Sequence, residues 1–208
     1  MNIETLQAWL PIIKDTATIL ATATAALVAI SGYRTWKKQL HWKTQYDLAQ
    51  RLLRATYKVR QAFAEVRRFY STEEEAQQAM KEANVEASQD PKIMFTRSQI
   101  AVYNKRWQKV SEAFGELESV SLEAEAIWGQ AVKVNLASLQ DCAGTLLATI
   151  GIHLDRLESP AISRNKEEIQ KERKIMFSHP GEKDNFFSNE IATAVRKVEN
   201  FVKPYLKI

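Results

Sequence analysis

The uncharged stretch TATILATATAALVAISGY, residues 16–33, decides how the rest of the chain is organised. At about 1.5 Å per helical residue it covers roughly 27 Å, which is close to the hydrocarbon thickness of a bilayer. Its apolar content is modest, because five large aliphatic residues each favour insertion by roughly 0.3 to 0.6 kcal/mol and most of the rest is Ala and Thr. We expect a transmembrane helix whose insertion is favourable but not strongly so.

Aromatic and basic residues flank this stretch in the pattern typical of a membrane span. Trp and Tyr favour the two membrane interfaces, and Lys and Arg accumulate on the cytoplasmic side. Residues 1–15 carry Glu4, Lys14 and Asp15, whereas four basic residues follow the stretch directly. The expected interface residues are Trp9, Tyr33, Arg34, Trp36, Lys37, Lys38, Trp42 and Lys43. This charge order predicts a single-pass protein of the bacterial inner membrane with its C-terminal part in the cytoplasm.

Two alternatives compete with the membrane span. Ala29 and Ser31 would make a passable signal-peptide cleavage site before Gly32, but a signal peptide carries its positive charge before the apolar region. The Ala and Thr content also permits a core helix of a soluble bundle. Within the span, Ala recurs every fourth residue from 17 to 29, a spacing that allows close helix approach or arises by chance in any Ala-rich helix. A homo-oligomer is therefore one hypothesis for the assembly.

The composition predicts an all-α protein with one main core. The chain has 208 residues but only six Gly and five Pro, and it is rich in strong helix formers. We expect an N-terminal segment with the transmembrane helix at 1–33 and a cytoplasmic antiparallel helical bundle at 34–208. The helix should continue past residue 33, because neither Gly nor Pro occurs between Gly32 and Pro91.

Positive charge is concentrated directly after the span. Residues 34–68 contain ten Lys and Arg against Asp47 and Glu65, so this segment carries +8 and the rest of the chain −4. Its position indicates a lipid bilayer with anionic head groups as a partner for the first four cations. A protein partner is a hypothesis for the later ones. Nucleic acid is disfavoured, because the block lacks accompanying exposed aromatics and a recognised binding motif.

Apolar periodicity places the helices of the bundle. Leu52, Val59 and Val66 are seven apart, as are Thr56, Phe63 and Tyr70, which predicts a buried stripe. Ser71 and Thr72 before three Glu predict a helix start, with the helix reaching about residue 88 and pairing with Arg67 and Arg68. Coiled-coil-like stripes at about 96–128 and from 132 to 157 predict two antiparallel helices. A charged helix over 164–176 with little core and a final helix from about 188, fraying near Pro204, complete the expected set.

No residue pattern indicates catalysis, a cofactor or a metal site. The three histidines, His41, His153 and His179, lack partners at a recognised metal-ligand spacing. Asp155 is two residues from His153 and should point to another side of the helix. The carboxylates Glu116, Glu118, Glu123 and Glu125 fit a solvated helix face, and Cys142 fits a buried small hydrophobe better than a reactive thiol. The sequence therefore predicts neither an enzyme nor a cofactor.

Three stretches, together with the order of the features described above, resemble a class of known proteins. They are WKTQYDLAQRLLRATYKVRQAFAEVRRF at 42–69, LEAEAIWG at 122–129 and VENFVKPYL at 198–206. Together with the single Ala-rich span, they resemble small uncharacterised bacterial membrane proteins with a cytoplasmic helical domain. The resemblance implies an inner-membrane setting and the topology derived from charge. It carries over no functional residue.

These features favour a membrane-anchored helical interaction or assembly module. One alternative is a regulatory or phage-defence component whose cytoplasmic bundle senses a ligand or protein and signals to the membrane. A second is a soluble helical bundle. An enzyme with an unfamiliar helical active site would need polar side chains that converge inside the bundle. A pocket lined by buried carboxylates or histidines would favour an enzyme or sensor, whereas a solid apolar core would favour the interaction module.

Overall fold

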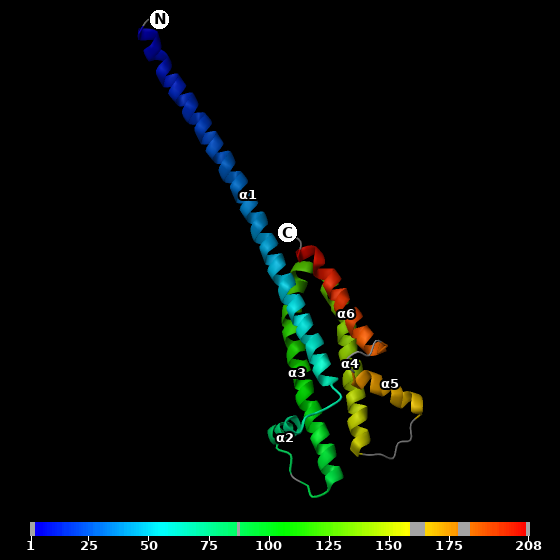
Figure 1. Cartoon of the computed structure of the whole chain (residues 1–208). Helices are drawn as coiled ribbons and strands as arrows, with labels where there is room; N and C mark the ends of the chain where they lie inside the picture. Colours follow the sequence, from blue (N-terminus) through cyan, green and yellow to red (C-terminus); the bar gives the residue numbers. More distant parts are fainter. Residues whose placement is uncertain (1–2, 87, 159–164, 179–183, 207–208) are drawn as a thin grey trace. The chain divides into compact units, whose positions relative to one another are not determined.

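The computed structural model describes residues 3–86, 88–158, 165–178 and 184–206, with side chains from Lys14 onward. These residues form six α-helices and no strand, which confirms the all-helical prediction. The elements are α1 (Ile3–Val66), α2 (Glu73–Glu82), α3 (Pro91–Trp128), α4 (Ala131–Glu158), α5 (Lys166–Met176), α6 (Phe186–Val202) and the 3-10 helix η1 (Lys203–Leu206) (Figure 1). The chain divides into two compact units, one up to Asp47 and one from Leu48 onward.

The second unit is a helical bundle in which α1 and α3 run antiparallel. Three ion pairs join these two helices, with separations of 2.6 to 2.8 Å: Arg51–Glu123, Lys58–Glu116 and Glu65–Lys109. From one ion pair to the next, the residue number rises by seven along α1 and falls by seven along α3, so the two helices are antiparallel. Residues seven apart lie on the same face of a helix, so one face of α1 follows one face of α3. Arg51 and Lys58 of the basic block therefore meet carboxylates of the same chain.

The helices α3 and α4 form the predicted antiparallel hairpin. Gly129, with φ of 70°, ends α3 in a backbone conformation that favours glycine, and its N–H donates to Glu125 O. Lys133 and Glu125 pair near this turn, at 2.9 Å. Far along the hairpin the Tyr103 and His153 rings lie edge to face, 6.1 Å between centroids. The short join and the matched apolar stripes are sufficient to specify this pair.

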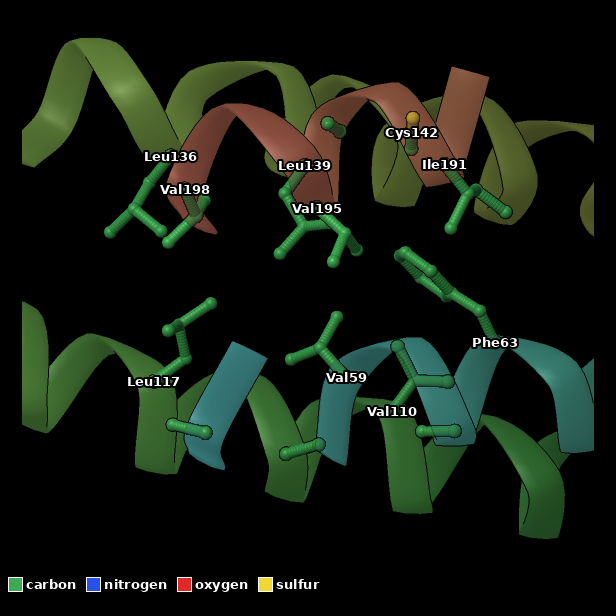
Figure 2. Close-up of a cluster of buried hydrophobic side chains, with 14 of the residues drawn as sticks. Val59, Phe63, Val110, Leu117, Leu136, Leu139, Cys142, Ile191, Val195 and Val198 are labelled. Carbon is green, nitrogen blue, oxygen red and sulfur yellow. The ribbon is translucent and has the colours of Figure 1, made fainter. Parts of the chain in front are cut away.

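The core lies between two layers, with α1 and α3 on one side and α4 and α6 on the other (Figure 2). In Figure 2 two rows of apolar side chains face each other: Leu136, Leu139 and Cys142 of α4 with Val198, Val195 and Ile191 of α6, and Leu117 and Val110 of α3 with Val59 and Phe63 of α1. Phe63, Leu139 and Val198 are at most 1% exposed. Burial of one such aliphatic or aromatic side chain stabilises the fold by roughly 1.5 to 3 kcal/mol, so this cluster holds the four helices together.

Two positions of the apolar pattern differ from the prediction. Tyr70 was expected on the buried stripe of the first helix, but it is 79% exposed because α1 ends at Val66. The charged helix α5 was expected to contribute little core, yet Ile175, Met176 and even Glu172 at its C-terminal end are buried. Apolar residues at one end of a charged helix are enough to anchor that end.

Local capping explains where α2 and α3 begin and end. Thr72 caps α2 as predicted, but the helix ends at Glu82 rather than near residue 88. Asn84 has a positive φ of 49°, and Val85 N donates to Met80 O at 3.0 Å, the hydrogen-bond pattern that closes a helix. Asp90 and Pro91 are the cap and first residue of α3 rather than a separate turn, since Asp90 accepts from Lys92 N at 2.8 Å.

The cap of α2 gives a stability prediction. The Thr72 hydroxyl oxygen accepts a hydrogen bond from Glu75 N at 3.1 Å. Thr72→Ala should destabilise the bundle by about 1 kcal/mol, because it removes this acceptor from the first helical turn. For a domain of this size the melting temperature, followed by circular dichroism in detergent, should fall by roughly 2 to 4 °C. Thr193→Ala, at an exposed position inside α6, is the control and should leave the melting temperature nearly unchanged. Equal melting temperatures for both variants would contradict the assigned cap.

Candidate membrane interface

The large apolar residues of the stretch 16–33 lie uncovered on the surface of α1. Ile19, Leu20, Leu27 and Val28 are each about two-thirds exposed. The best 18-residue window of this helix has a mean hydropathy of 1.5 and no buried residue. By length and composition the helix could cross a membrane, although a signal sequence near an N-terminus would meet the same criteria.

The threonines of this segment satisfy their own hydroxyl groups within the helix. The hydroxyls of Thr18, Thr22 and Thr24 each donate to the backbone carbonyl oxygen four residues earlier, at 2.8 Å. A hydroxyl without a partner is costly in hydrocarbon, because no water is present to accept its proton. These internal hydrogen bonds lower the cost of placing Thr in a bilayer, so the Thr content is compatible with a span.

The predicted interface residues follow the apolar segment on the same helix. Those whose side chains are described are all exposed: Tyr33, Arg34, Trp36, Lys37, Lys38, Trp42 and Lys43. The predicted interface residue Trp9 belongs to α1, but its side chain lies outside the described part. The Tyr33 and Trp36 rings are neighbours, with centroids 6.2 Å apart. Aromatic rings with polar edges are suited to the headgroup region of a membrane, where one part of the ring is apolar and another is wet.

Arg67 connects the end of α1 to the segments around α5 and α6. It is only 3% exposed, and its guanidinium lies 5.0 Å from the centroid of the Phe187 ring. The guanidinium donates hydrogen bonds to five acceptors: Lys174 O, Ile175 O, Phe177 O, Asn185 Oδ1 and Ser188 Oγ. Sequence reasoning paired Arg67 with the acidic start of α2 and missed this cluster. A signal was present, because Arg67 lies four residues after Phe63 and so extends the buried stripe.

Arg106 forms a second buried cation site, between α3 and the start of α2. It is 4% exposed, and its guanidinium makes two hydrogen bonds of 2.8 Å to the two Glu75 carboxylate oxygens. Two further hydrogen bonds reach the carbonyl oxygens of Arg68 and Tyr70, both at 2.9 Å. Arg68 lies 3.7 Å from Glu75, which agrees with the predicted pairing of this residue with the acidic run. The cluster fixes the connection between α1 and α2.

The Glu75 contacts predict how stability depends on acid. The Arg106 hydrogen bonds lower the pKa of Glu75 from its ordinary value, and the charges of Arg106 and Arg68 act in the same direction against partial burial. Because the folded-state pKa is lowered, the stabilisation is fully present above the unfolded value of about 4.3 and is lost as pH falls through the folded pKa. Glu75→Gln should therefore flatten the loss of stability below about pH 4.5, measured by denaturant unfolding across pH.

Glu74→Gln is the matched control for this acid dependence, since Glu74 is the exposed neighbour of Glu75. The control variant should keep the native slope of unfolding free energy against pH. An unchanged slope in Glu75→Gln would show that the Arg106 contact contributes nothing to acid sensitivity.

His153 pairs with a carboxylate, but not with Asp155. Its Nδ1 lies 3.2 Å from an oxygen of Glu172 on α5, and Arg156 donates to the other Glu172 oxygen. Glu172 is 7% exposed, so the pair of donors on α4 offsets the burial of this carboxylate. The cluster joins α5 to α4. Glu172 is the carboxylate of this cluster. The third histidine of the sequence, His179, lies outside the described residues.

Cys142 is buried beside a groove with a partly polar lining. This groove runs between α4 and α6 and is lined by hydroxyl, amide and charged groups: Ser138, Asp141, Thr145, Asn189, Glu190, Thr193 and Lys197. Burial first, then the negative charges of Glu190 and Asp141, raise the pKa of the Cys142 thiol to about 11. The thiol therefore stays protonated near neutral pH, as expected for a structural cysteine.

The exposed carboxylates of α3 act mainly as ion-pair partners. Glu116 and Glu123 pair with α1, and Glu125 pairs with Lys133. Across the described residues, no three His, Cys, Asp or Glu side chains come together in an arrangement that could hold a metal ion. No family model, no curated protein and no solved structure matches the chain.

Proposed function

We propose that this protein is a membrane-anchored interaction or assembly module, with residues 16–33 in the bilayer and the helical bundle in the cytoplasm. The observation that carries the proposal is the uncovered apolar surface of α1. Exposure of large aliphatic side chains such as Leu20 and Leu27 to water is unfavourable, and no residue of the 18-residue window is buried. A bilayer would cover this surface on all sides of the helix.

The distribution of charge supports the orientation of the proposed span. No Asp or Glu occurs between Asp15 and Asp47, while Arg34, Lys37, Lys38 and Lys43 all follow the apolar residues. Basic residues close to a span are retained on the cytoplasmic side. The bundle, which begins at Leu48, would therefore lie in the cytoplasm.

The interior of the bundle supports an interaction module more than a catalyst. Most of its buried side chains are apolar. The buried polar side chains serve as structural contacts: Thr56 and Thr149 donate to helix carbonyls, and Arg67, Arg106, Glu172 and Asn185 bind neighbouring segments. Catalysis would require a polar group directed at a bound substrate. Each of these groups instead stabilises the fold.

Thiol labelling in intact bacterial cells tests the proposed orientation. With Cys142→Ser as background, a membrane-impermeant maleimide should label Glu4→Cys in intact cells and Arg196→Cys only after permeabilisation. Arg196 is an exposed residue of α6, so labelling at that position reports access from one side of the membrane. Labelling of Arg196→Cys in intact cells, with Glu4→Cys protected, would reverse the proposed topology. Equal labelling of both before and after permeabilisation would contradict a span.

The assembly part of the proposal is tested by purification from detergent-solubilised membranes. Mass spectrometry of the purified material should identify a partner at fixed stoichiometry, or light scattering should give a multiple of the 23.8 kDa chain mass. A chain that is recovered alone and as a monomer, under detergents that preserve membrane complexes, would contradict an assembly role.

A further inference from the structure

The basic residues of α1 differ in whether they form ion pairs. Arg51 and Lys58, in the bundle, form ion pairs with α3 carboxylates. The four cations nearer the apolar segment, Arg34, Lys37, Lys38 and Lys43, are all exposed, and no described carboxylate pairs with them. Neighbouring like charges repel one another, and an anionic partner outside the chain would relieve this repulsion.

Helix geometry gathers three of these cations on one face. At about 100° per residue, Arg34, Lys37 and Lys38 fall within a sector of roughly 100°, and His41 falls in the same sector. We call these four residues the cationic face. Lys43 is nine residues from Arg34 and lies roughly 180° away, on the opposite side of the helix.

The cationic face continues directly into the apolar segment. Ile30 and Leu27 lie on the same sector of α1, one and two turns before Arg34 respectively, and are half-exposed or more. A shallow groove on the helix surface is lined by Ile30 and the whole cationic face, with Tyr33 and Trp42 at its edges. His41 is held by Gln45, with 3.0 Å between their side-chain nitrogens. The groove thus joins an apolar strip to three positively charged donors, Arg34, Lys37 and Lys38, with His41 beside them.

We propose that this groove binds an anionic phospholipid, with the phosphate on the cationic face and an acyl chain along Ile30 and Leu27. The proposal rests on the membrane anchoring proposed above and names its lipid partner. An arginine presents a planar fork of donors that fits phosphate oxygens in pairs, and lysines add point charges beside it. A zwitterionic lipid offers the same acyl chain but brings its own cation, which Arg34 and the lysines repel.

Charge complementarity selects a lipid over a nucleic acid as the occupant. A nucleic acid would match the cations but would leave Ile30 and Leu27 exposed to water. A phospholipid matches both halves of the groove. Its phosphate also lies at the depth where Tyr33 and Trp42 favour the headgroup region.

The test must separate a site on one face from general attraction to a negative surface. Lys38 and Gln39 are neighbours, and exchanging them (Lys38→Gln with Gln39→Lys) keeps the composition and net charge and shifts the charge by about 1.5 Å along the axis. The exchange turns that charge by about 100°, away from the cationic face. If the attraction is diffuse, the exchange should leave the preference for anionic lipid unchanged. If the site is specific to one face, the exchange should remove one of its donors and lower that preference.

Native mass spectrometry of the full-length protein, released from micelles with equal amounts of phosphatidylglycerol and phosphatidylcholine, provides the measurement. The native chain should retain phosphatidylglycerol preferentially. Both Lys38→Gln and the Lys38/Gln39 exchange should lower that preference roughly fivefold, the effect of one lysine near anionic lipid. Lys43→Gln should change it much less. A short DNA duplex added as competitor should not displace the lipid.

Four results would overturn the proposal. They are equal retention of the two lipids by the native chain, full preference in the exchanged variant, an equal loss in Lys43→Gln, and displacement of the lipid by the duplex. Alkaline extraction of each protein from pure phosphatidylcholine vesicles separates this failure from failure of anchoring. If all variants resist extraction, anchoring holds and only the lipid site is in question; if the native chain is extracted, the anchoring proposal itself is wrong.

Discussion

Ala25→Asp should move the protein out of the membrane. Ala25 lies at the middle of the stretch 16–33, where an Asp costs roughly 2.5 to 3.5 kcal/mol of insertion free energy. The five aliphatic residues of the stretch together supply a gain of only about 1.5 to 3 kcal/mol. The added cost is about as large as this gain, so the insertion equilibrium constant should fall roughly 100-fold and much of the protein should stay outside the membrane.

The inserted fraction can be measured by translating the chain in the presence of membrane vesicles and counting the share that resists alkaline extraction. Ala148→Asp is the matched control, since Ala148 is an exposed residue of α4 in the bundle. It should insert like the native chain. If Ala25→Asp and Ala148→Asp distribute alike, residues 16–33 are in contact with water or protein rather than lipid.

Arg67→Met should cause the largest loss of stability of any single change in the bundle that removes a charge. Methionine keeps the apolar stem but removes the guanidinium donors from Ile175 O, Lys174 O and the other acceptors around α5 and α6. Leaving buried acceptors without donors costs about 1 to 3 kcal/mol each, with partial compensation by water, so a total of about 3 to 5 kcal/mol is expected. The melting temperature should fall by roughly 10 °C.

Arg68→Met separates this effect from a general loss of charge. Arg68 is the next residue, its side chain is 59% exposed, and its contact with Glu75 is longer, at 3.7 Å. Its removal should change stability by roughly 0.5 kcal/mol or less. Hydrogen exchange should show early opening of α5 in Arg67→Met and not in Arg68→Met. Similar losses in the two variants would mean that the buried contacts of Arg67 do not stabilise the fold.

The long helices could be predicted from sequence because their apolar residues repeat with a helical period. Val110 and Leu117 in α3, and Leu139 and Leu146 in α4, are buried as the stripes required. Gly129 marks the turn between the two helices. In such elements the burial pattern and the helix period agree, so local sequence determines both the helix and its buried face.

Helix ends and buried charges were harder to predict, because they depend on contacts between distant segments. Tyr70 continued the stripe in sequence but fell outside α1, and the end of α2 depended on a positive φ at Asn84. The sequence did not indicate that Arg67 and Arg106 are buried, since a charged residue is rarely buried unless partners satisfy it. Those partners are backbone carbonyls and carboxylates brought near by the fold, which no spacing along the chain reveals.

The candidate interface was predictable in composition and position, whereas its charge balance needed the structure. Sequence places Tyr33, Trp36 and Trp42 beside four cations. It does not show that Arg51 and Lys58 already have carboxylate partners while Arg34 does not. That difference separates the cations that already pair within the bundle from those for which we propose a lipid partner.

Fractionation of the unmodified full-length protein from bacterial cells, without detergent, tests the central claim most directly. We predict that the chain sediments with membranes, resists alkaline extraction and floats with lipid in a density gradient. Recovery as a compact soluble monomer, with residues 16–33 protected from hydrogen exchange by other helices of the same chain, would contradict the account.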